Sequence, residues 1–355
     1  METEVIKIDT NTPDWQTKLD YPAHVIKSGG LVAFPTETVY GLGANAFDEN
    51  ALEGIYKAKG RPSDNPLIVH VADIEKVSEL VRKMPPIAKK LMEAFWPGPL
   101  TLIMPKSDKV PFIITAGLDT VAVRMPSNAI ALELIKKSGV PVAAPSANSS
   151  GKPSPTLAGH VISDLSGRID IIIDGGSTRV GVESTVLDIT VDPPVILRPG
   201  GITREQLQQV LGKVDQETSV SPLPMETRPR SPGMKYRHYA PNAVLLLIQG
   251  CPGRVAEEIS RRAELYNNDG NYVGILTTDE SASLYEPSLY TFCKFLSLGS
   301  GNRPESLAAN LFKRLREFDE AGVDVILAET PDARGIGQAV MNRLLKASGG
   351  NIIKL

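Results

Sequence analysis

The sequence contains few of the residues on which metal sites, disulfide scaffolds and membrane segments depend. Among its 355 residues there are two cysteines, Cys251 and Cys293, and four histidines. Two cysteines alone cannot complete a four-ligand zinc site, and their number suggests no disulfide framework. No apolar stretch approaches the ~18 residues that cross a bilayer, and the first ten residues lack the basic start and apolar run of a signal peptide. We therefore expect a cytoplasmic protein with no membrane contact.

A strong charge of one sign is also missing. The formal net charge of −3 gives no general attraction to nucleic acid or to an anionic membrane, although a local basic groove stays possible. Three catalytic motifs are absent as well: the phosphate-binding Walker loop, the metalloprotease H-E-x-x-H and the hydrolase elbow G-x-S-x-G. Nucleophilic catalysis and zinc-dependent hydrolysis are therefore both disfavoured.

What the chain does contain is an ordinary globular composition, 42% hydrophobic and 22% charged, in a length that favours two domains. Strand-like and helix-like runs alternate, which is typical of an α/β fold with a mixed sheet. The predicted helices span 50–59, 86–95 and 129–138, and the predicted strands lie at 67–71, 101–105, 121–126, 140–145 and 169–176.

The periodic pattern stops after Leu211 and returns near residue 242. The segment between them is proline-rich and basic at its end, so we interpret 212–241 as a linker or a functional lid. Strands and helices then alternate to the C-terminus, which predicts a small Rossmann-like parallel-sheet domain over 242–355. This domain has no G-x-G-x-x-G after a strand, so no dinucleotide site is expected. The larger domain, 1–211, is the candidate for chemistry.

Polar residues at strand and helix ends are the candidates for that chemistry. Lys59 and Arg61 flank a glycine at a predicted helix end. They form either an oligophosphate clamp or only a partner for the helix dipole and a solvated turn residue. Ser146 and Asn148, in a stretch of small residues, offer hydroxyl and amide contacts, or make a simple turn. Arg124, in a strand-like run, needs either a carboxylate partner or a ligand.

The order of these motifs carries a resemblance. FPTETVYGLGANAF (34–47), KAKGRP (57–62), SAN (146–148), ESTVLD (183–188) and LRPG (197–200) resemble the YrdC-like domain, with its open twisted mixed sheet and helices. SPGMKYRHYAP (231–241), followed by a small α/β domain, resembles the long-form L-threonylcarbamoyladenylate synthases. The resemblance implies a nucleotidyltransferase that joins L-threonine, bicarbonate and ATP into threonylcarbamoyl-AMP and pyrophosphate. A separate transferase complex would then modify the adenosine beside the tRNA anticodon, and weak tRNA contact is possible.

The resemblance also implies which residues meet the substrates. Mg²⁺ would accompany ATP, with no protein metal site and no tightly bound organic cofactor. We expect Lys59 and Arg61 to be the catalytic charge clamp and Arg124 to pair with the threonine carboxylate. Glu37 would assist the amine or pair with a nearby base. The expected ATP side comprises Lys59, Arg61, Asn65, Thr120, Ser146, Asn148, Ser154, Arg198 and Tyr239, and the expected threonine side comprises Thr36, His70, Arg124, Ala144 and Ser184.

Three further interpretations concern the linker and two other functions. Aromatic and basic side chains crowd SPGMKYRHYAP, which favours a lid with Tyr239 reaching the nucleotide over a plain spacer. An RNA-binding module without turnover is one alternative function, disfavoured by overall acidity and by the lack of an aromatic stacking motif. A carbamoyl-adenylate-forming maturation factor is the other. Proteins of that kind carry cysteine-rich zinc modules, which two late cysteines cannot supply.

Overall fold

The computed structural model describes residues 2–217, 229–231 and 238–355. Within this part the chain divides into two compact units. The first includes residues 2–150 and 154–217, and the second includes residues 151–153 and 238–355. The predicted linker, 212–241, falls largely outside the described residues. Of its described part, Asp215 and Gln216 form a short strand, β11, that pairs with the sheet of the first unit.

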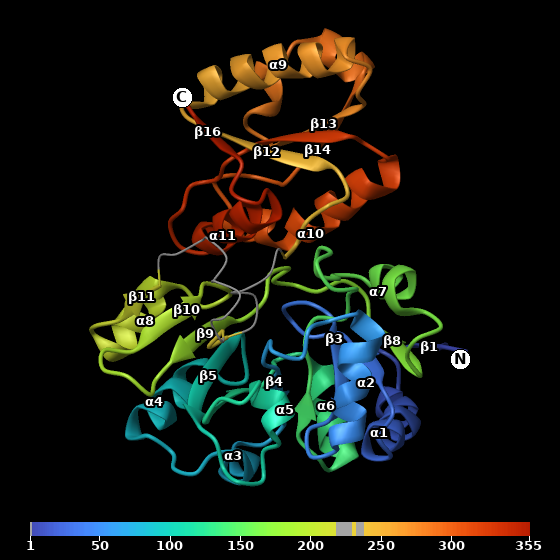
Figure 1. Cartoon of the computed structure of the whole chain (residues 1–355), viewed down its shortest axis with the longest axis vertical. Coiled ribbons are helices and arrows are strands. Elements are labelled where there is room, and N and C mark those ends of the chain that lie inside the picture. Colours follow the sequence, from blue (N-terminus) through green and yellow to red (C-terminus); the bar gives the residue numbers. More distant parts are fainter. Residues whose placement is uncertain (1, 218–228, 232–237) are drawn as a thin grey trace. The chain divides into compact units, whose positions relative to one another are not determined.

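The first unit is built on one mixed sheet of eleven strands (Figure 1). Parallel and antiparallel pairs alternate irregularly: β4 runs parallel to β6, which runs antiparallel to β5. The predicted mixed sheet is thus confirmed. In spatial order the strands are β1 (Glu4–Lys7), β8 (Ile171–Asp174), β2 (Val32–Phe34), β3 (Gly41–Asn45), β7 (Val142–Ala143), β4 (Ile68–His70), β6 (Thr120–Arg124), β5 (Leu100–Pro105), β9 (Thr185–Asp188), β10 (Val195–Arg198) and β11 (Asp215–Gln216).

Local signals set the limits of the helices in this unit. Asp48 caps the first turn of α2 by accepting from two backbone N–H groups, and Gly60 ends the helix in the left-handed conformation (φ 62°). Asn128 and Gly139 do the same for α6. The three helices predicted at 50–59, 86–95 and 129–138 are confirmed as α2, α4 and α6. The helices are α1 (Asp20–Lys27), α2 (Glu49–Lys59), α3 (Val77–Leu80), α4 (Pro86–Phe95), α5 (Phe112–Thr115), α6 (Ala129–Ser138), α7 (Ala158–Leu165) and α8 (Arg204–Leu211).

The second unit is a five-stranded sheet in which every pair is parallel, as the alternating pattern predicts. Figure 1 shows α9 on one face of this sheet and α10 and α11 on the other. The sequence reading missed two of its strands, β14 and β16. In spatial order the strands are β14 (Cys293–Ser297), β13 (Val273–Thr277), β15 (Val325–Glu329), β12 (Val244–Gln249) and β16 (Ile352–Lys354), and the helices are α9 (Pro252–Asn268), α10 (Pro304–Ala321) and α11 (Gly337–Ala347).

Hydrophobic residues of the helices and strands form a separate core in each unit. In the first unit, Leu52 and Ile55 of α2 are fully buried with Leu42 of β3. In the second, Ile259 of α9 is fully buried in the same cluster as Leu327 of β15. Among the described helices, none is long and apolar enough to cross a membrane.

Candidate active site

The centre of the candidate site is a buried ion pair. Nη2 of Arg124, at the end of β6, lies 2.7 Å from Oε1 of Glu37, and each side chain is only 4% exposed. The guanidinium also donates to the Thr38 hydroxyl (3.0 Å) and to the Gly98 carbonyl (3.3 Å). Neither carboxylate oxygen of Glu37 receives an aligned hydrogen bond from the described residues, so the group keeps acceptor capacity. The sequence predicted that Arg124 has either a carboxylate partner or a ligand. Glu37 is that carboxylate partner.

Other predicted threonine-side residues lie next to Arg124 in the sheet. His70 of β4 stands in register with Arg124, and Thr101 of β5 is its register partner on the opposite side. The Thr101 hydroxyl is 2.7 Å from the hydroxyl of Ser184, and the backbone N–H of Ala144 donates to a β4 carbonyl (2.9 Å). His70 and Thr101 thus flank Arg124 on the two neighbouring strands, and Ala144 and Ser184 come one strand further out on either side. Whether each meets threonine stays a prediction.

His70 is a neutral imidazole in the fold. Burial lowers its pKa to about 3, and the positive charge of Arg124 acts in the same direction. Its Nδ1 atom is buried and has no hydrogen-bond partner among the described residues. A neutral ring with an unsatisfied nitrogen can bind a polar ligand group as donor or acceptor, according to its tautomer.

Thr36 folds its own loop. Its hydroxyl donates to the Val39 carbonyl (2.6 Å), accepts from the Val39 N–H and lies 2.8 Å from the Thr38 hydroxyl. Through Thr38 this small network reaches the guanidinium of Arg124. The prediction that Thr36 bonds to threonine is untested; its observed contacts show that it shapes the loop that holds Arg124.

The same motif contains two glycines, Gly41 and Gly43. Both lie in strand β3 with no left-handed backbone, so neither is needed for a tight turn. A Cβ on Gly43 would stand 2.7 Å from the Phe34 ring and 2.8 Å from a methyl group of Val142. The side chain is therefore absent because neighbouring strands bring large groups over the glycine.

Lys59 ties the end of α2 to the SAN loop. Its ammonium donates to the carbonyls of Ser146 and Asn148, and its side chain is 3% exposed. The Ser146 hydroxyl in turn donates to the side-chain oxygen of Asn148 (2.5 Å). Lys59 is thus the last residue of α2, at the predicted helix end, and its side chain is buried rather than solvated. Its contact with phosphate stays a prediction.

Arg61 and Asn65 occupy the turn after α2. Arg61 donates through Nη2 to the carbonyls of Pro66 (3.2 Å) and Asn65 (3.4 Å). The Asn65 side chain is 1% exposed, and neither polar atom of its amide has a hydrogen-bond partner among the described residues. An unsatisfied buried amide is rare and costs ~1–3 kcal/mol, so it favours a missing partner. A hydrogen bond from ATP, as expected for Asn65, would supply the partner that its amide lacks.

Ser154 and Arg198, also of the expected ATP side, are held by buried hydrogen bonds. The Ser154 hydroxyl donates to Oε1 of Glu183 (2.5 Å), and both side chains are buried. Arg198 donates twice to the Ser184 carbonyl, from Nε (3.1 Å) and from Nη2 (3.0 Å). Arg198 therefore connects the two expected sides through Ser184. Thr120 begins β6 and is half-buried.

Tyr239 lies in the second unit. It is 5% exposed, its ring centroid is 5.2 Å from that of Phe312, and the Arg343 guanidinium carbon stands 5.4 Å from its ring centre. Its backbone is left-handed (φ 67°), which is unusual for a tyrosine. Residues 232–237 of the predicted lid lie outside the described residues, and the contact between Tyr239 and a nucleotide stays a prediction.

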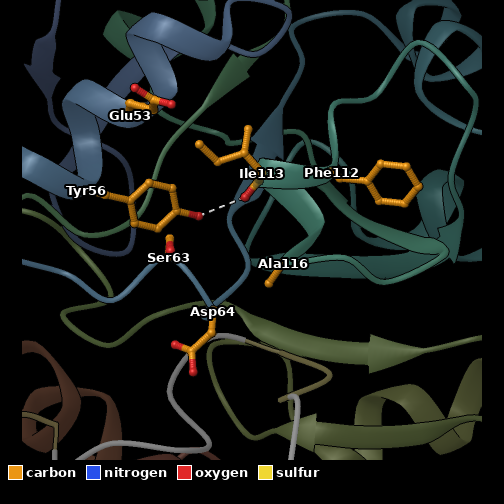
Figure 2. A pocket seen from close by; sticks show the side chains of 7 residues that line it. All are labelled: Glu53, Tyr56, Ser63, Asp64, Phe112, Ile113 and Ala116. Atoms are coloured by element: carbon orange, nitrogen blue, oxygen red, sulfur yellow. Dashed lines mark hydrogen bonds between the residues drawn. The ribbon is translucent and has the colours of Figure 1, made fainter.

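A pocket of about 400 Å³ lies beside the turn that carries Asn65 (Figure 2). The Tyr56 hydroxyl donates to the Ile113 carbonyl at its wall (3.0 Å). Glu53 and Asp64 supply carboxylates to the lining, and no basic side chain is among the lining residues, so this pocket does not suit a phosphate. Its lining consists of Glu53, Tyr56, Ser63, Asp64, Phe112, Ile113 and Ala116.

Sequence reasoning missed three positioning groups: Thr38, Thr101 and Glu183. Each touches a predicted residue, respectively Arg124, Ser184 and Ser154. A hydroxyl or carboxylate beside an apolar run was the only signal available, and it is weak without tertiary contacts. Among the described residues, no three His, Cys, Asp or Glu side chains gather closely enough to hold a metal ion.

Comparison with known proteins gives matches along the whole chain. Residues 24–200 match the family described as Telomere recombination, and residues 202–349 match the family described as Threonylcarbamoyl-AMP synthase, C-terminal domain. The threonylcarbamoyl-AMP synthase of Pyrococcus abyssi is 49% identical over 353 residues, which cover 99% of this chain and all of the relative. That of Bacillus subtilis is 50% identical over 349 residues, which cover 98% and 96%.

A solved structure shares the architecture as well as the sequence. The crystal structure of Pyrococcus abyssi Sua5 complexed with L-threonine aligns with a TM-score of 0.93 at 50% identity, over 99% of this chain and all of that one.

Proposed function

The chain belongs to the threonylcarbamoyl-AMP synthase family, and we propose that it makes threonylcarbamoyl-AMP from L-threonine, bicarbonate or CO2, and ATP, with release of pyrophosphate. It is a nucleotidyltransferase-type enzyme of tRNA processing. The observation that carries the proposal is the full-length likeness, at 50% identity, to a protein crystallised with L-threonine. The buried guanidinium of Arg124 supplies the group that an amino-acid carboxylate requires.

On the threonine side, Arg124 forms a charge-assisted pair with the substrate carboxylate. Its geometry is fixed in advance by Glu37, Thr38 and Gly98, so little ordering is left for binding. His70, neutral because it is buried, accepts or donates one hydrogen bond beside it. The amine of threonine must be neutral to attack. Its addition to CO2 forms the N–C bond and releases a proton to solvent, whereas the same product from bicarbonate requires the loss of water. An oxygen of the resulting N-carboxylate then attacks the α-phosphorus of ATP while pyrophosphate leaves.

On the ATP side, two anions must meet, so positive charge and orientation are the main requirements. Arg61 and Lys59 provide that charge near the α2 end, and Arg198 provides it near Ser184. The side-chain amide of Asn65, which has no partner among the described residues, forms hydrogen bonds with the nucleotide. Magnesium would be bound as part of the ATP substrate, where it would neutralise phosphate charge beside Lys59 and Arg61.

The product then passes to a tRNA threonylcarbamoyl transferase complex, which places the group on the adenosine next to the anticodon. We propose that the enzyme acts in the cytoplasm, where ATP and newly made tRNA are available, and that any contact with tRNA is weak. Neither alternative function, RNA binding without turnover or carbamoyl-adenylate formation, has a specific observation in its favour.

The direct test incubates the full chain with MgATP, bicarbonate and each amino acid in turn. We expect pyrophosphate release and an adenylate of the mass of threonylcarbamoyl-AMP with threonine only. Pyrophosphate release that does not depend on threonine would refute the assignment. Strongly salt-dependent RNA binding with no turnover would support the RNA-binding module instead.

A further inference from the structure

A second cavity, of about 310 Å³, lies within the first unit. Four stretches of chain line it: residues 71–73 after β4, Lys76 at the end of the short 3-10 helix Ile74–Lys76, the last turn of α6, and residues 139–141, which lead into β7. None of the residues assigned to threonine or to ATP is among the lining residues. The cavity is therefore separate from the candidate active site.

The apolar part of the lining belongs to the core of the unit. Val71 and Ile135 are only 1% and 4% exposed, and Ala72 and Val140 pack against the core cluster that contains Ile135. Pro141, next to Val140, is also buried. Small-molecule sites are typically concave and mostly apolar, with a few polar groups that fix the orientation of the ligand. The apolar lining therefore suits a ligand with a hydrocarbon body.

Backbone geometry holds these walls in place. The Val71 N–H donates to the Arg124 carbonyl (3.0 Å), which continues the pairing of β4 with β6. Gly139 ends α6 in the left-handed conformation (φ 71°), and the Ser138 hydroxyl donates to the Val140 carbonyl (3.2 Å). A ligand therefore meets a site that is already formed, and little conformational entropy is lost on binding.

The charged residues of the lining differ in how far they are already engaged. Lys76 is paired with Glu79 (2.7 Å), and the Asp73 carboxylate accepts from the N–H of Glu75 (2.9 Å). Lys136 is exposed and makes no ion pair with a described residue. Its ammonium is thus available to a ligand anion. The carboxylate of Asp73 repels a second negative charge, so the lining favours a monoanion over a dianion such as phosphate.

We propose that this cavity binds a small monocarboxylate with an apolar body, and that its carboxylate pairs with Lys136. At the ~30 Å³ that a water molecule occupies in the liquid, the cavity holds about ten non-hydrogen atoms. That is the size of a short-chain fatty acid or a simple aromatic acid, and it is too small for a nucleotide. The site takes no part in the proposed reaction, so this inference goes beyond the function proposed above.

A water-filled surface depression makes a different prediction. In that case the cavity is only the hollow beside the turn at Gly139, and its lysines are ordinary solvated side chains. Such a depression does not distinguish an anion from a neutral molecule or a cation of the same length. It also gives no reason for Lys136 and Asp73 to affect binding in opposite directions.

The test uses the full chain and three probes with the same hydrocarbon chain: hexanoate, 1-hexanol and hexylammonium. Ligand-observed NMR titrations measure the Kd of each. We expect hexanoate to bind with a Kd of about 1 mM, in keeping with a ligand of so few atoms. The other two probes should bind about fivefold more weakly, because neither can pair with the ammonium of Lys136.

Two substitutions test the charges. K136M keeps the aliphatic stem and removes the ammonium, so it should weaken hexanoate binding about fourfold and leave 1-hexanol unchanged. D73N keeps an oxygen that can accept from the Glu75 N–H and removes the negative charge. It should strengthen hexanoate binding and weaken hexylammonium binding, each about twofold. K89M, at an exposed position of α4 outside the lining, is the matched control and should bind all three probes as the wild type does.

Hydrogen exchange locates the bound probe. Saturating hexanoate should slow exchange in peptides covering 71–76 and 135–141, and A72F, which fills the cavity, should abolish both this protection and the binding. Equal affinity for the three probes, unchanged hexanoate binding in K136M, or protection only in other peptides would each overturn the proposal. If A72F does not fold, the opposite effects expected of K136M and D73N on hexanoate still decide the matter.

Discussion

Nη2 of Arg124 lies 2.7 Å from Oε1 of Glu37, and both side chains are almost completely buried. The carboxylate balances the guanidinium charge and turns it toward Thr38 and Gly98. Removing either partner alone leaves a buried uncompensated charge, which typically costs ~3–5 kcal/mol. The pair is thus both a structural element and the proposed carboxylate receptor, and the two roles need separate tests.

The first prediction separates these roles. Arg124→Met should raise the KM for threonine at least ~10-fold, because no other donor replaces the guanidinium, and should change the KM for ATP much less. Steady-state pyrophosphate release against each substrate measures both values. Thermal unfolding should show a marked loss of stability, because Glu37 is left unpaired.

The double variant E37Q/R124M is the matched control, since it removes both charges. It should recover much of the lost stability but none of the affinity for threonine. Recovery of threonine binding in the double variant would mean that Arg124 is only a structural partner of Glu37.

A second prediction concerns the charge clamp. Arg61→Met should lower turnover by ~10² with little change in stability, because the guanidinium is only partly buried on a turn. Lys59→Met should lower both turnover and stability, because the buried ammonium donates to the Ser146 and Asn148 carbonyls. Urea unfolding and single-turnover assays on the two variants give the comparison. Near-wild-type turnover in both variants would show that Lys59 and Arg61 do not form a catalytic charge clamp.

How far the sequence predicts this site depends on whether its signals are local. The signal for the end of α2 is local: the helical pattern stops at Lys59, and a glycine follows it. The predicted helix end is confirmed, and Gly60 forms it with a left-handed backbone. The partner of Arg124 is not local, because the pairing with Glu37 arises only when β6 and the loop after β2 meet. The sequence reading accordingly left Glu37 open between two roles.

Two strands that the sequence pattern did not predict, β11 and β16, have the same explanation. β11 has only two residues and β16 only three, too few to show a period of two. They exist because β10 and β12 offer unpaired edges to the chain that follows. The parallel sheet of the second unit was predictable because strands and long helices alternate along most of its length.

A third prediction uses the lowered pKa of His70. Burial lowers it to about 3, from about 6.5 in the unfolded chain, so below pH 6.5 the unfolded state takes up a proton that the folded state refuses. Its contribution to stability is therefore complete above pH 6.5 and is lost progressively as the pH falls toward 3. At pH 5 the loss is about 2 kcal/mol.

Urea unfolding of the wild type and of His70→Asn at pH 7.5 and at pH 5.0 measures this loss of stability. The wild type should lose more stability between the two pH values than His70→Asn. An identical pH dependence in wild type and His70→Asn would show that the imidazole takes up its proton in the fold.

The last prediction concerns Gly43. An alanine there would put its Cβ 2.7 Å from the Phe34 ring and 2.8 Å from Val142, both held in the sheet, so neither neighbour can withdraw easily. We expect Gly43→Ala to lower the free energy of unfolding by ~1–3 kcal/mol through overpacking.

Gly159→Ala is the matched control, because Gly159 lies in α7 with no atom within 4 Å of the added Cβ. Helix propensity should make that variant equal to or more stable than the wild type, by up to ~1 kcal/mol. Thermal and urea unfolding of the two alanine variants decide the matter: equal stabilities would mean that β3 shifts to accept a side chain, and that contact with Phe34 is not why a glycine stands there.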